Sequence, residues 1–296
     1  MKLAHPSVPN HYYDFGPPNG HRTGDIWAGL PSFGLVATPQ CRGLLITPRC
    51  DLSHDKTDVL TFLPILSCDL YLRRLQHLPT IWAAMCSSLQ PLSITPPPVD
   101  LAQANLSVAP HLPAIRTSLA DVSDKGSQKE IIARDRALAA LNYVESMNTG
   151  KPTTVTLEQV LPPREWTQTS ARIVTNAYRP DVHFLPADGQ NERWSAVPQH
   201  SLCLFRSPIS LPARCLTEAQ LALDVDWETT CDGLTSEVPA ATYLRAARPI
   251  KLATLRLEFL SDILTRFVGL YGRLGSADFT DDTVSRYCAA LSVPTV

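Results

Sequence analysis

The chain has 296 residues, of which 44% are hydrophobic and 18% are charged, and its formal net charge is −2. This composition allows a substantial core and predicts one elaborated domain, or a domain that carries a large insertion. The nearly neutral charge excludes the global basic field that marks many nucleic-acid-binding proteins.

Hydropathy and cysteine usage indicate the compartment. No run approaches the roughly 18 apolar residues that span a bilayer, and residues 1–9 lack the apolar stretch of a signal peptide, so we expect a cytoplasmic protein with no membrane contact.

The eight cysteines are scattered without a CxxC pair, which predicts free thiols in a reducing compartment. We expect no cofactor and no metal. A zinc site from Cys41, Cys50, His54 and Cys68 is the alternative, although their spacing matches no standard zinc module.

The N-terminal part predicts a small sheet. Residues 1–20 are rich in His, Pro, Tyr and Asn and should form an irregular arm. Three short apolar runs then follow between turn residues, at positions 25–29, 43–47 and 59–66. Such runs are typical of short antiparallel strands, so residues 21–70 should form the first part of a strongly bent β-barrel.

Residues 71–175 should interrupt this sheet with helices and a proline-rich connection. Leucines recur at helical spacing over residues 70–89, and six prolines between positions 91 and 113 predict an extended segment. A long helix is expected over residues 127–147, where Ser127 and Glu130 can form a capping box. Shorter helices are expected over residues 156–160 and 163–169.

Residues 176–215 should return to the sheet, since short apolar runs lie at positions 182–185 and 201–206. These two strands would complete the barrel. Residues 216–296 should form a C-terminal helical region, and its strongest element is a helix over residues 250–274 with apolar residues three and four apart. These residues are Leu252, Leu255, Phe259, Ile263, Phe267, Leu270 and Leu274.

The connection at residues 47–56 concentrates reactive side chains. An arginine and a lysine flank Cys50, and their charge would lower the pKa of its thiol and favour the thiolate. His54 could act as its base, and Asp51 could orient that histidine or hold a cation. The alternative is structural: the polar side chains cap the turn, and Cys50 packs beneath it.

Several motifs in residues 22–70 carry a family resemblance. They are Gly24-Asp25-Ile26-Trp27, Pro31-Ser32-Phe33-Gly34, Arg42 ahead of an apolar strand, and a strand that ends in Pro64-Ile65-Leu66-Ser67. In this order they resemble toxins of the MazF/PemK type, which are small SH3-like barrels that cut single-stranded RNA without a metal. The resemblance implies an α+β fold: an SH3-like (PemK-type) antiparallel β-barrel with a helical, Pro-rich insertion and a C-terminal helix.

The same resemblance implies site residues. In that family an arginine before the second strand and a threonine after the third carry the chemistry; here these positions fall on Arg42 and on Leu66, with Ser67 beside it. The acidic and amide residues that usually follow the turn are replaced by Leu35, Val36 and Ala37. Together with the loop residues, the candidate catalytic set is Arg42, Cys50, Asp51, His54 and Ser67.

A second resemblance concerns the Cys50-Asp51-Leu52 motif and the segment Arg273 to Gly275. Both are similar to features of a group of uncharacterised bacterial proteins, which implies a bacterial origin and a place among defence or toxin-like genes. Elsewhere, Pro180-Asp181 with Glu192 resembles a pattern of metal-dependent nucleases, but Trp194 stands where a lysine would be expected.

These observations lead to one hypothesis and two alternatives. The hypothesis is a bacterial toxin- or defence-related protein that binds RNA through the barrel, with metal-independent endoribonuclease (hydrolase) activity left open. Arg42 would bind the phosphate, while Asp51 and His54 would act in acid–base or orienting roles. The first alternative is a non-catalytic interaction subunit, docked on a protein partner in a phage-defence or toxin–antitoxin complex. The second is thiol or metal chemistry at Cys50.

Overall fold

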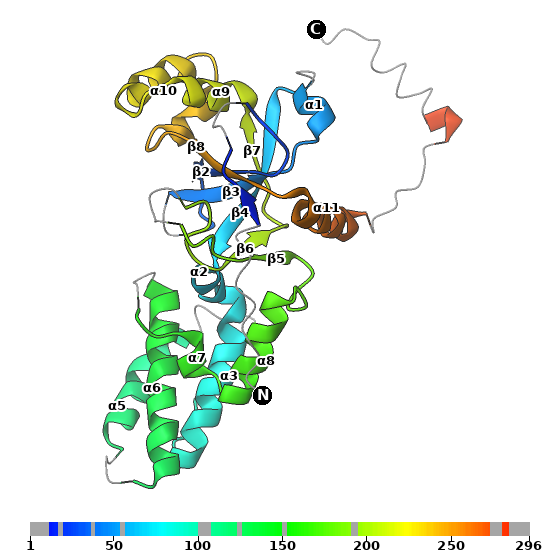
Figure 1. Cartoon of the computed structure of the whole chain (residues 1–296). Coiled ribbons are helices and arrows are strands. Elements are labelled where there is room, and N and C mark those ends of the chain that lie inside the picture. Colours follow the sequence, from blue (N-terminus) through cyan, green and yellow to red (C-terminus); the bar gives the residue numbers. More distant parts are fainter. Residues whose placement is uncertain are drawn as a thin grey trace.

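The structure is a computed structural model that describes residues 12–16, 20–36, 39–53, 57–99, 108–122, 126–149, 153–190, 195–272 and 280–283. Figure 1 shows an upper part built around a β-sheet and a lower part made of helices. The chain leaves the sheet through α2 (Cys68–Leu72) and returns to it through β5 (Val182–Leu185). We call the helices from α2 to α8 the helical block.

Within the described residues, eight strands form one antiparallel sheet in the order β1–β8–β2–β3–β4–β6–β5, and β7 also pairs with β4. Runs predicted at positions 25–29, 43–47, 59–66, 182–185 and 201–206 all contribute strands to it. The strands are β1 (Tyr13–Asp14), β2 (Asp25–Pro31), β3 (Gln40–Leu45), β4 (Val59–Ser67), β5, β6 (Ser201–Leu204), β7 (Ile209–Pro212) and β8 (Ile250–Leu255).

The prediction of a helix over residues 250–274 is wrong for its first six residues. Residues 250–255 form β8, which pairs with both β1 and β2, and the helix α11 spans only Leu257–Tyr271. Lys251, Ala253 and Leu255 are buried in alternation with more exposed neighbours, which is the period of a strand. Leucines at positions 252 and 255 also satisfy helical spacing, so the apolar pattern alone favoured the wrong element.

The sheet is open in its backbone hydrogen bonds, with β1 and β5 at its two ends. In a flat sheet, six strand spacings would separate these strands by roughly 29 Å. However, the Tyr13 hydroxyl in β1 donates a hydrogen bond of 2.6 Å to the carbonyl of Pro186, directly after β5. The sheet is therefore strongly curled. The fold is α+β as expected, but the strand pairings form an open antiparallel sheet and not the closed barrel that was predicted.

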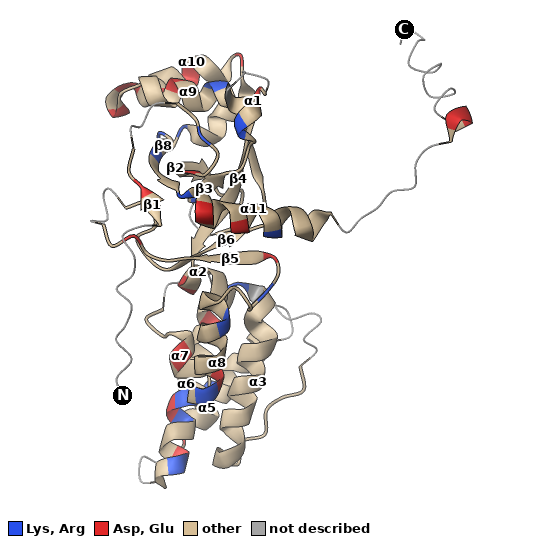
Figure 2. Ribbon diagram, turned by 45° about the vertical axis from the view of Figure 1, so that its right-hand side comes forward, with Lys and Arg blue, Asp and Glu red and all other residues tan. Residues whose placement is uncertain are grey.

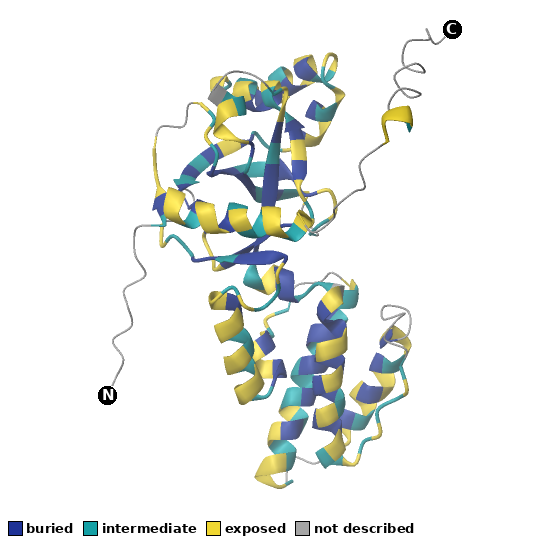
Figure 3. Cartoon of the chain, turned by 90° about the vertical axis from the view of Figure 1, so that its right-hand side faces the viewer, coloured by how far each residue is buried: buried dark blue, intermediate teal, exposed yellow. Residues whose placement is uncertain are grey.

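Each face of the sheet packs against its own core. The first core, which includes Trp27 and Leu202, also contains buried residues of α9 (Ala213–Leu221), of α10 (Trp227–Thr235) and of the helical block. The second core, which includes Ile26 and Leu63, lies on the opposite face and is covered by α11 through Ile263. Figure 3 shows strands that are mostly buried and helices that expose one side. The remaining elements of the upper part are α1 (Arg49–Ser53), η5 (Asp224–Asp226) and η6 (Pro239–Leu244).

The helical block is organised around the long helix α6, which packs against α3, α5 and α7. Its start is the predicted capping box: the Ser127 amide donates to the Glu130 carboxylate at 2.7 Å, and the Glu130 amide donates to the Ser127 hydroxyl at 3.4 Å. The helical segment predicted over residues 70–89 is divided near Pro79, as expected for a proline that starts a new turn, and α3 begins there. The helices are η1 (Leu75–His77), α3 (Leu78–Leu89), η2 (Gln90–Leu92), η4 (Ala109–His111), α5 (Leu112–Ala120), α6 (Gln128–Thr149), α7 (Leu157–Val160) and α8 (Pro163–Val174).

Candidate functional site

Arg42, the predicted phosphate-binding residue, lies in β3 and shares with Leu44 the face that contacts the second core. Its side chain reaches the connection between β5 and β6, where Nη2 lies 3.5 Å from the carbonyl of Ser195. Burial lowers the pKa of Arg42, and the nearby carboxylate of Asp188 partly restores it. The guanidinium is thus held inside the protein by that connection.

Those predicted loop residues that the structure describes belong to α1, which packs toward the other face of the sheet. Cys50 and Asp51 lie in the short helix α1, where Cys50 is exposed, while Leu52 packs against the first core. His54 and Lys56 lie outside the described residues. Because Arg42 faces the second core and α1 packs toward the first, the structure does not gather them on one wall.

Ser67 has a local structural role. It is the last residue of β4, and its hydroxyl accepts a hydrogen bond of 3.2 Å from the amide of Leu70. This contact caps the first turn of α2, which satisfies a backbone donor that has no partner inside the helix. Ser67 therefore marks the point where the chain leaves the sheet for the helical block.

The Gly24-Asp25 pair of the first motif also serves the fold. A side chain at Gly24 would place its Cβ 2.9 Å from a methyl of Leu260, and the φ angle of +96° favours glycine as well. The fully buried carboxylate of Asp25 lies 3.0 Å from the ammonium of Lys251 and accepts a hydrogen bond from the Thr254 hydroxyl. The Gly24-Asp25 pair therefore fixes β2 to β8.

A charged cluster that no sequence motif indicated lies where the helical block meets the sheet. The carboxylate of Asp181, 10% exposed, accepts hydrogen bonds from Arg179 Nε at 3.0 Å and from Arg206 Nε at 2.9 Å. Among the described residues, the terminal nitrogens of Arg206 have no protein partner, and its side chain is 65% exposed. We call Arg179, Asp181 and Arg206 the arginine clamp.

Aromatic and polar groups surround the base of the clamp. His77, which is buried, lies 3.2 Å from the Tyr178 hydroxyl and 3.0 Å from the Gln76 side-chain nitrogen, and its ring stacks on that of Tyr178. Burial, assisted by the positive charges of Arg179 and Arg74, lowers the pKa of His77 to about 4. His77 is therefore neutral at physiological pH, and the positive charge here belongs to the arginines.

A second ionisable pair lies next to the clamp on β5. His183, which is buried, has its Nε2 2.9 Å from a carboxylate oxygen of Asp262 in α11, and Arg266 pairs with the same carboxylate at 3.0 Å. Burial lowers the pKa of His183, and Asp262 offsets only part of this effect. Burial would raise the pKa of Asp262, but hydrogen bonds from His183 and Arg266 bring it below its ordinary value. The pair ties α11 to β5.

The clamp was not visible in the sequence because its members come from separate elements. Arg179 and Asp181 lie between α8 and β5, whereas Arg206 follows β6. Asp181 belongs to the pattern that resembled metal-dependent nucleases, but its carboxylate is occupied by two guanidinium groups; Glu192 and Trp194 lie outside the described residues. Only the pairing of β5 with β6 brings the two arginines together.

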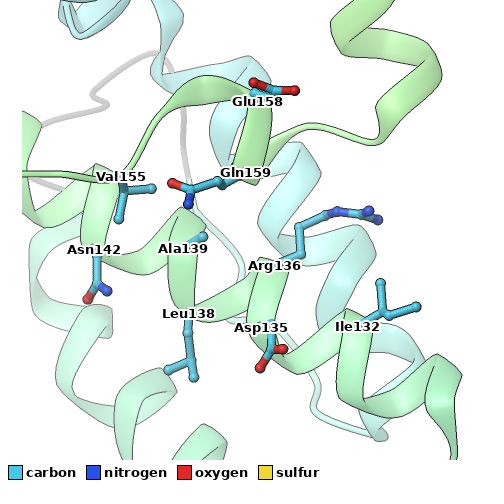
Figure 4. Close-up of a pocket in the computed structure, with 9 residues that line it drawn as sticks. All are labelled: Ile132, Asp135, Arg136, Leu138, Ala139, Asn142, Val155, Glu158 and Gln159. Atoms are coloured by element: carbon cyan, nitrogen blue, oxygen red, sulfur yellow. The ribbon is translucent and has the colours of Figure 1, made fainter.

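The helical block carries a hollow of about 530 Å³ between α6 and α7 (Figure 4). Its lining combines Arg136 with the acidic Asp135 and Glu158 and with the apolar Ile132. This mixture of charges favours no single class of ligand. The described part of the chain contains no group of three or more His, Cys, Asp or Glu side chains that could hold a metal ion.

Comparison with known proteins adds no family to this description. The chain matches no protein-family model, no curated protein and no solved structure. Among the described helices, none has both the length and the apolar character needed to cross a bilayer. The proposed function therefore rests on the geometry of the arginine clamp.

Proposed function

We propose that this is a bacterial toxin- or defence-related protein that binds single-stranded RNA, with phosphate contacts at the arginine clamp. The observation that supports this proposal is a pair of guanidinium groups oriented by one nearly buried carboxylate. A planar guanidinium matches the geometry of a phosphate and forms strong charge-assisted hydrogen bonds with it. Pre-orientation by Asp181 lowers the conformational entropy lost when a phosphate binds.

The surroundings of the clamp favour an anion. Arg74 lies close enough to lower the pKa of His77, Arg172 lowers that of Tyr178, and Arg266 lies beside His183. These three arginines and the two of the clamp, counted with the paired Asp181 and Asp262, give a local net charge of +3. Local positive charge of this kind can bind a phosphate chain although the whole protein has a net charge of −2.

The curled sheet supports a PemK-type barrel as the finer description of the fold. The approach of the two edge strands through Tyr13 is what a barrel with an incomplete backbone ladder would have. In a relative of such toxins RNA would be the expected ligand. The clamp lies beside β5, where this barrel would meet the helical block.

Metal-independent RNA cleavage is a separate hypothesis that comes from the sequence resemblance, because Arg42 lies apart from Cys50 and Asp51 and the Ser67 hydroxyl caps α2. Incubation of purified protein with short mixed-sequence single-stranded RNA and a chelator tests it. Cleavage that Arg42→Ala abolishes, with an unchanged circular dichroism spectrum, would support a catalytic role. If the purified protein cuts no single-stranded RNA, the cleavage hypothesis is contradicted. RNA binding is tested by a separate experiment.

Binding is tested by fluorescence anisotropy with labelled single-stranded RNA. Arg206→Gln and Arg179→Gln should each weaken the affinity about tenfold, because a hydrogen bond to a charged group contributes about 1.5–3 kcal/mol. The matched control is Arg214→Gln, which removes another exposed, ion-paired arginine, on α9. The proposal would be contradicted if Arg214→Gln reduced the RNA affinity as much as the clamp variants do, or if the clamp variants kept the wild-type RNA affinity.

A second candidate function is a non-catalytic interaction subunit of a phage-defence or toxin–antitoxin complex. The observation that favours it is a row of exposed apolar side chains at positions 221–225, at the opposite end of the molecule from the helical block. A protein partner that co-purifies stably would support this function. The same partner should still co-purify with the Arg42→Ala variant.

A further inference from the structure

Three strongly exposed apolar residues lie close together in one short segment of the described chain. Val225, Leu221 and Leu223 are 85%, 76% and 66% exposed, and they are three of the four most exposed large apolar side chains among the described residues. Single exposed apolar residues are normal on a protein surface, but a group of them marks an interaction site. We call these three residues the apolar ridge.

The ridge is a folded structure. Leu221 ends α9, Val225 lies in η5, and the turn between them is held by a backbone hydrogen bond of 3.1 Å from the Asp226 amide to the Leu223 carbonyl. The next residue, Trp227, is buried and donates its indole N–H to the carbonyl of Leu244 at 2.9 Å. The buried tryptophan anchors the turn, so its apolar side chains are presented in a fixed arrangement.

The ridge lies in an acidic part of the molecule. Residues 213–249 contain six acidic residues and three arginines, a net charge of −3, whereas the whole chain carries −2. Figure 2 shows acidic residues distributed over α9 and α10. Asp226, between Val225 and Trp227, has no ion-pair partner in the described part of the chain. A ligand that covered the ridge would therefore gain from positive charge.

A hollow of about 360 Å³ adjoins the ridge. Asp224, which lies between Leu223 and Val225, lines it together with Trp227 and the partly exposed Ile250. Arg248 and Arg245 also line it and pair with Asp224 and Glu228, so the charges inside the hollow are balanced. An apolar side chain could enter the hollow while a lysine or arginine next to it met the carboxylate of Asp226. The three observations describe a protein-docking surface with a defined chemistry.

We propose that the apolar ridge is the docking surface for a basic protein segment in which apolar side chains alternate with lysine or arginine. Nucleic acid and anionic membranes are disfavoured there, because the surface is negatively charged. A second copy of this chain would bring the same negative charge to the contact. The inference holds whether or not the arginine clamp binds RNA, since the two surfaces are separate.

The test uses the full chain and a labelled peptide of alternating lysine and leucine, followed by fluorescence anisotropy. Two comparison peptides remove one feature each: glutamate replaces lysine in the first, and glycine replaces leucine in the second. The wild type should bind the lysine–leucine peptide at least tenfold more tightly than either. The double substitution Leu223→Ser, Val225→Ser should reduce this affinity at least tenfold without any change in net charge.

The matched control is Val174→Ser, which removes an exposed apolar side chain from α8 in the helical block. It should retain the wild-type affinity for the peptide, and the double variant should retain wild-type RNA affinity and circular dichroism. The proposal is overturned if the double variant binds the peptide as the wild type does. If the wild type forms a concentration-dependent dimer that the double variant loses, the ridge binds a second copy of the chain. If deletion of residues 284–296 increases the affinity for the peptide, the ridge binds the chain's own C-terminal segment. Either result also overturns the proposal.

Discussion

Asp181 is acidic, yet we expect it to favour the acidic ligand proposed for the clamp, because its carboxylate orients both arginines. Asp181→Asn removes a negative charge, so a purely electrostatic account expects tighter RNA binding. The geometry leads to the opposite expectation: the two guanidinium groups lose their common partner, and RNA affinity falls several-fold.

Anisotropy titration of Asp181→Asn with single-stranded RNA checks this expectation, with Asp232→Asn as the control. Asp232 also pairs with an arginine, but it lies in α10. Its substitution should leave RNA affinity unchanged. Tighter binding by Asp181→Asn would show that the carboxylate merely opposes the ligand.

His77 makes stability depend on pH. Its pKa is about 4 in the folded protein against about 6.5 in an unfolded chain. Between these values the unfolded chain binds more protons, so acidification destabilises the fold, by about 3 kcal/mol once the pH is below 4. Urea unfolding at pH 7 and pH 5 should show lower stability at pH 5.

The variant His77→Gln should lessen this dependence. Burial also lowers the pKa of His183 and of His21, so part of the dependence should remain. His111→Gln, in the helical block, is the control and should keep the wild-type difference between the two pH values. An unchanged difference in His77→Gln would mean that His77 does not titrate as its burial implies.

At the scale of elements, β2 and β8 are joined by a buried ion pair between Asp25 and Lys251. Lys251→Met leaves the Asp25 carboxylate buried without its cation, which should cost about 3–5 kcal/mol of unfolding free energy. Chemical denaturation measures this loss. Adding Asp25→Leu to Lys251→Met removes the unpaired charge and should recover part of the stability; a single variant as stable as the wild type would contradict the pairing.

The elements also show which features the sequence predicts. The capping box at Ser127 is a local signal and was found, as were the short strands bounded by turn residues. The strand β8 was missed because Leu252 and Leu255 fit both a strand and a helix. The choice between them depends on pairing with β1 and β2, and that information lies more than 200 residues away in the chain.

The candidate site is harder to predict for the same reason. Arg42 and α1 are neighbours in sequence, but Arg42 shares the face of Leu44 against the second core, whereas Leu52 of α1 packs against the first core. Arg179 and Arg206 are distant in sequence and share one carboxylate in space. Site residues that depend on strand pairing cannot be inferred from spacing along the chain.

For the whole molecule, the proposed RNA binding should depend only moderately on salt concentration, because few phosphate contacts are expected. Two phosphate contacts at the clamp predict a slope of about −1.4 for the logarithm of affinity against the logarithm of salt concentration on a single strand. Involvement of the three neighbouring arginines would make the slope steeper. Titrations at several salt concentrations measure it, and a slope near zero would contradict phosphate binding.

The position of β8 has a consequence for synthesis on the ribosome. Among the described strands, the one at residues 250–255 is the last to emerge, yet it lies between β1 and β2 and is the only described partner of β1. Until it emerges, the nascent chain exposes one side of β2 as an unpaired edge, which is open to pairing with other chains. Ribosomes stalled before this point should therefore carry nascent chains that aggregate readily or recruit chaperones, whereas chains released after it should not.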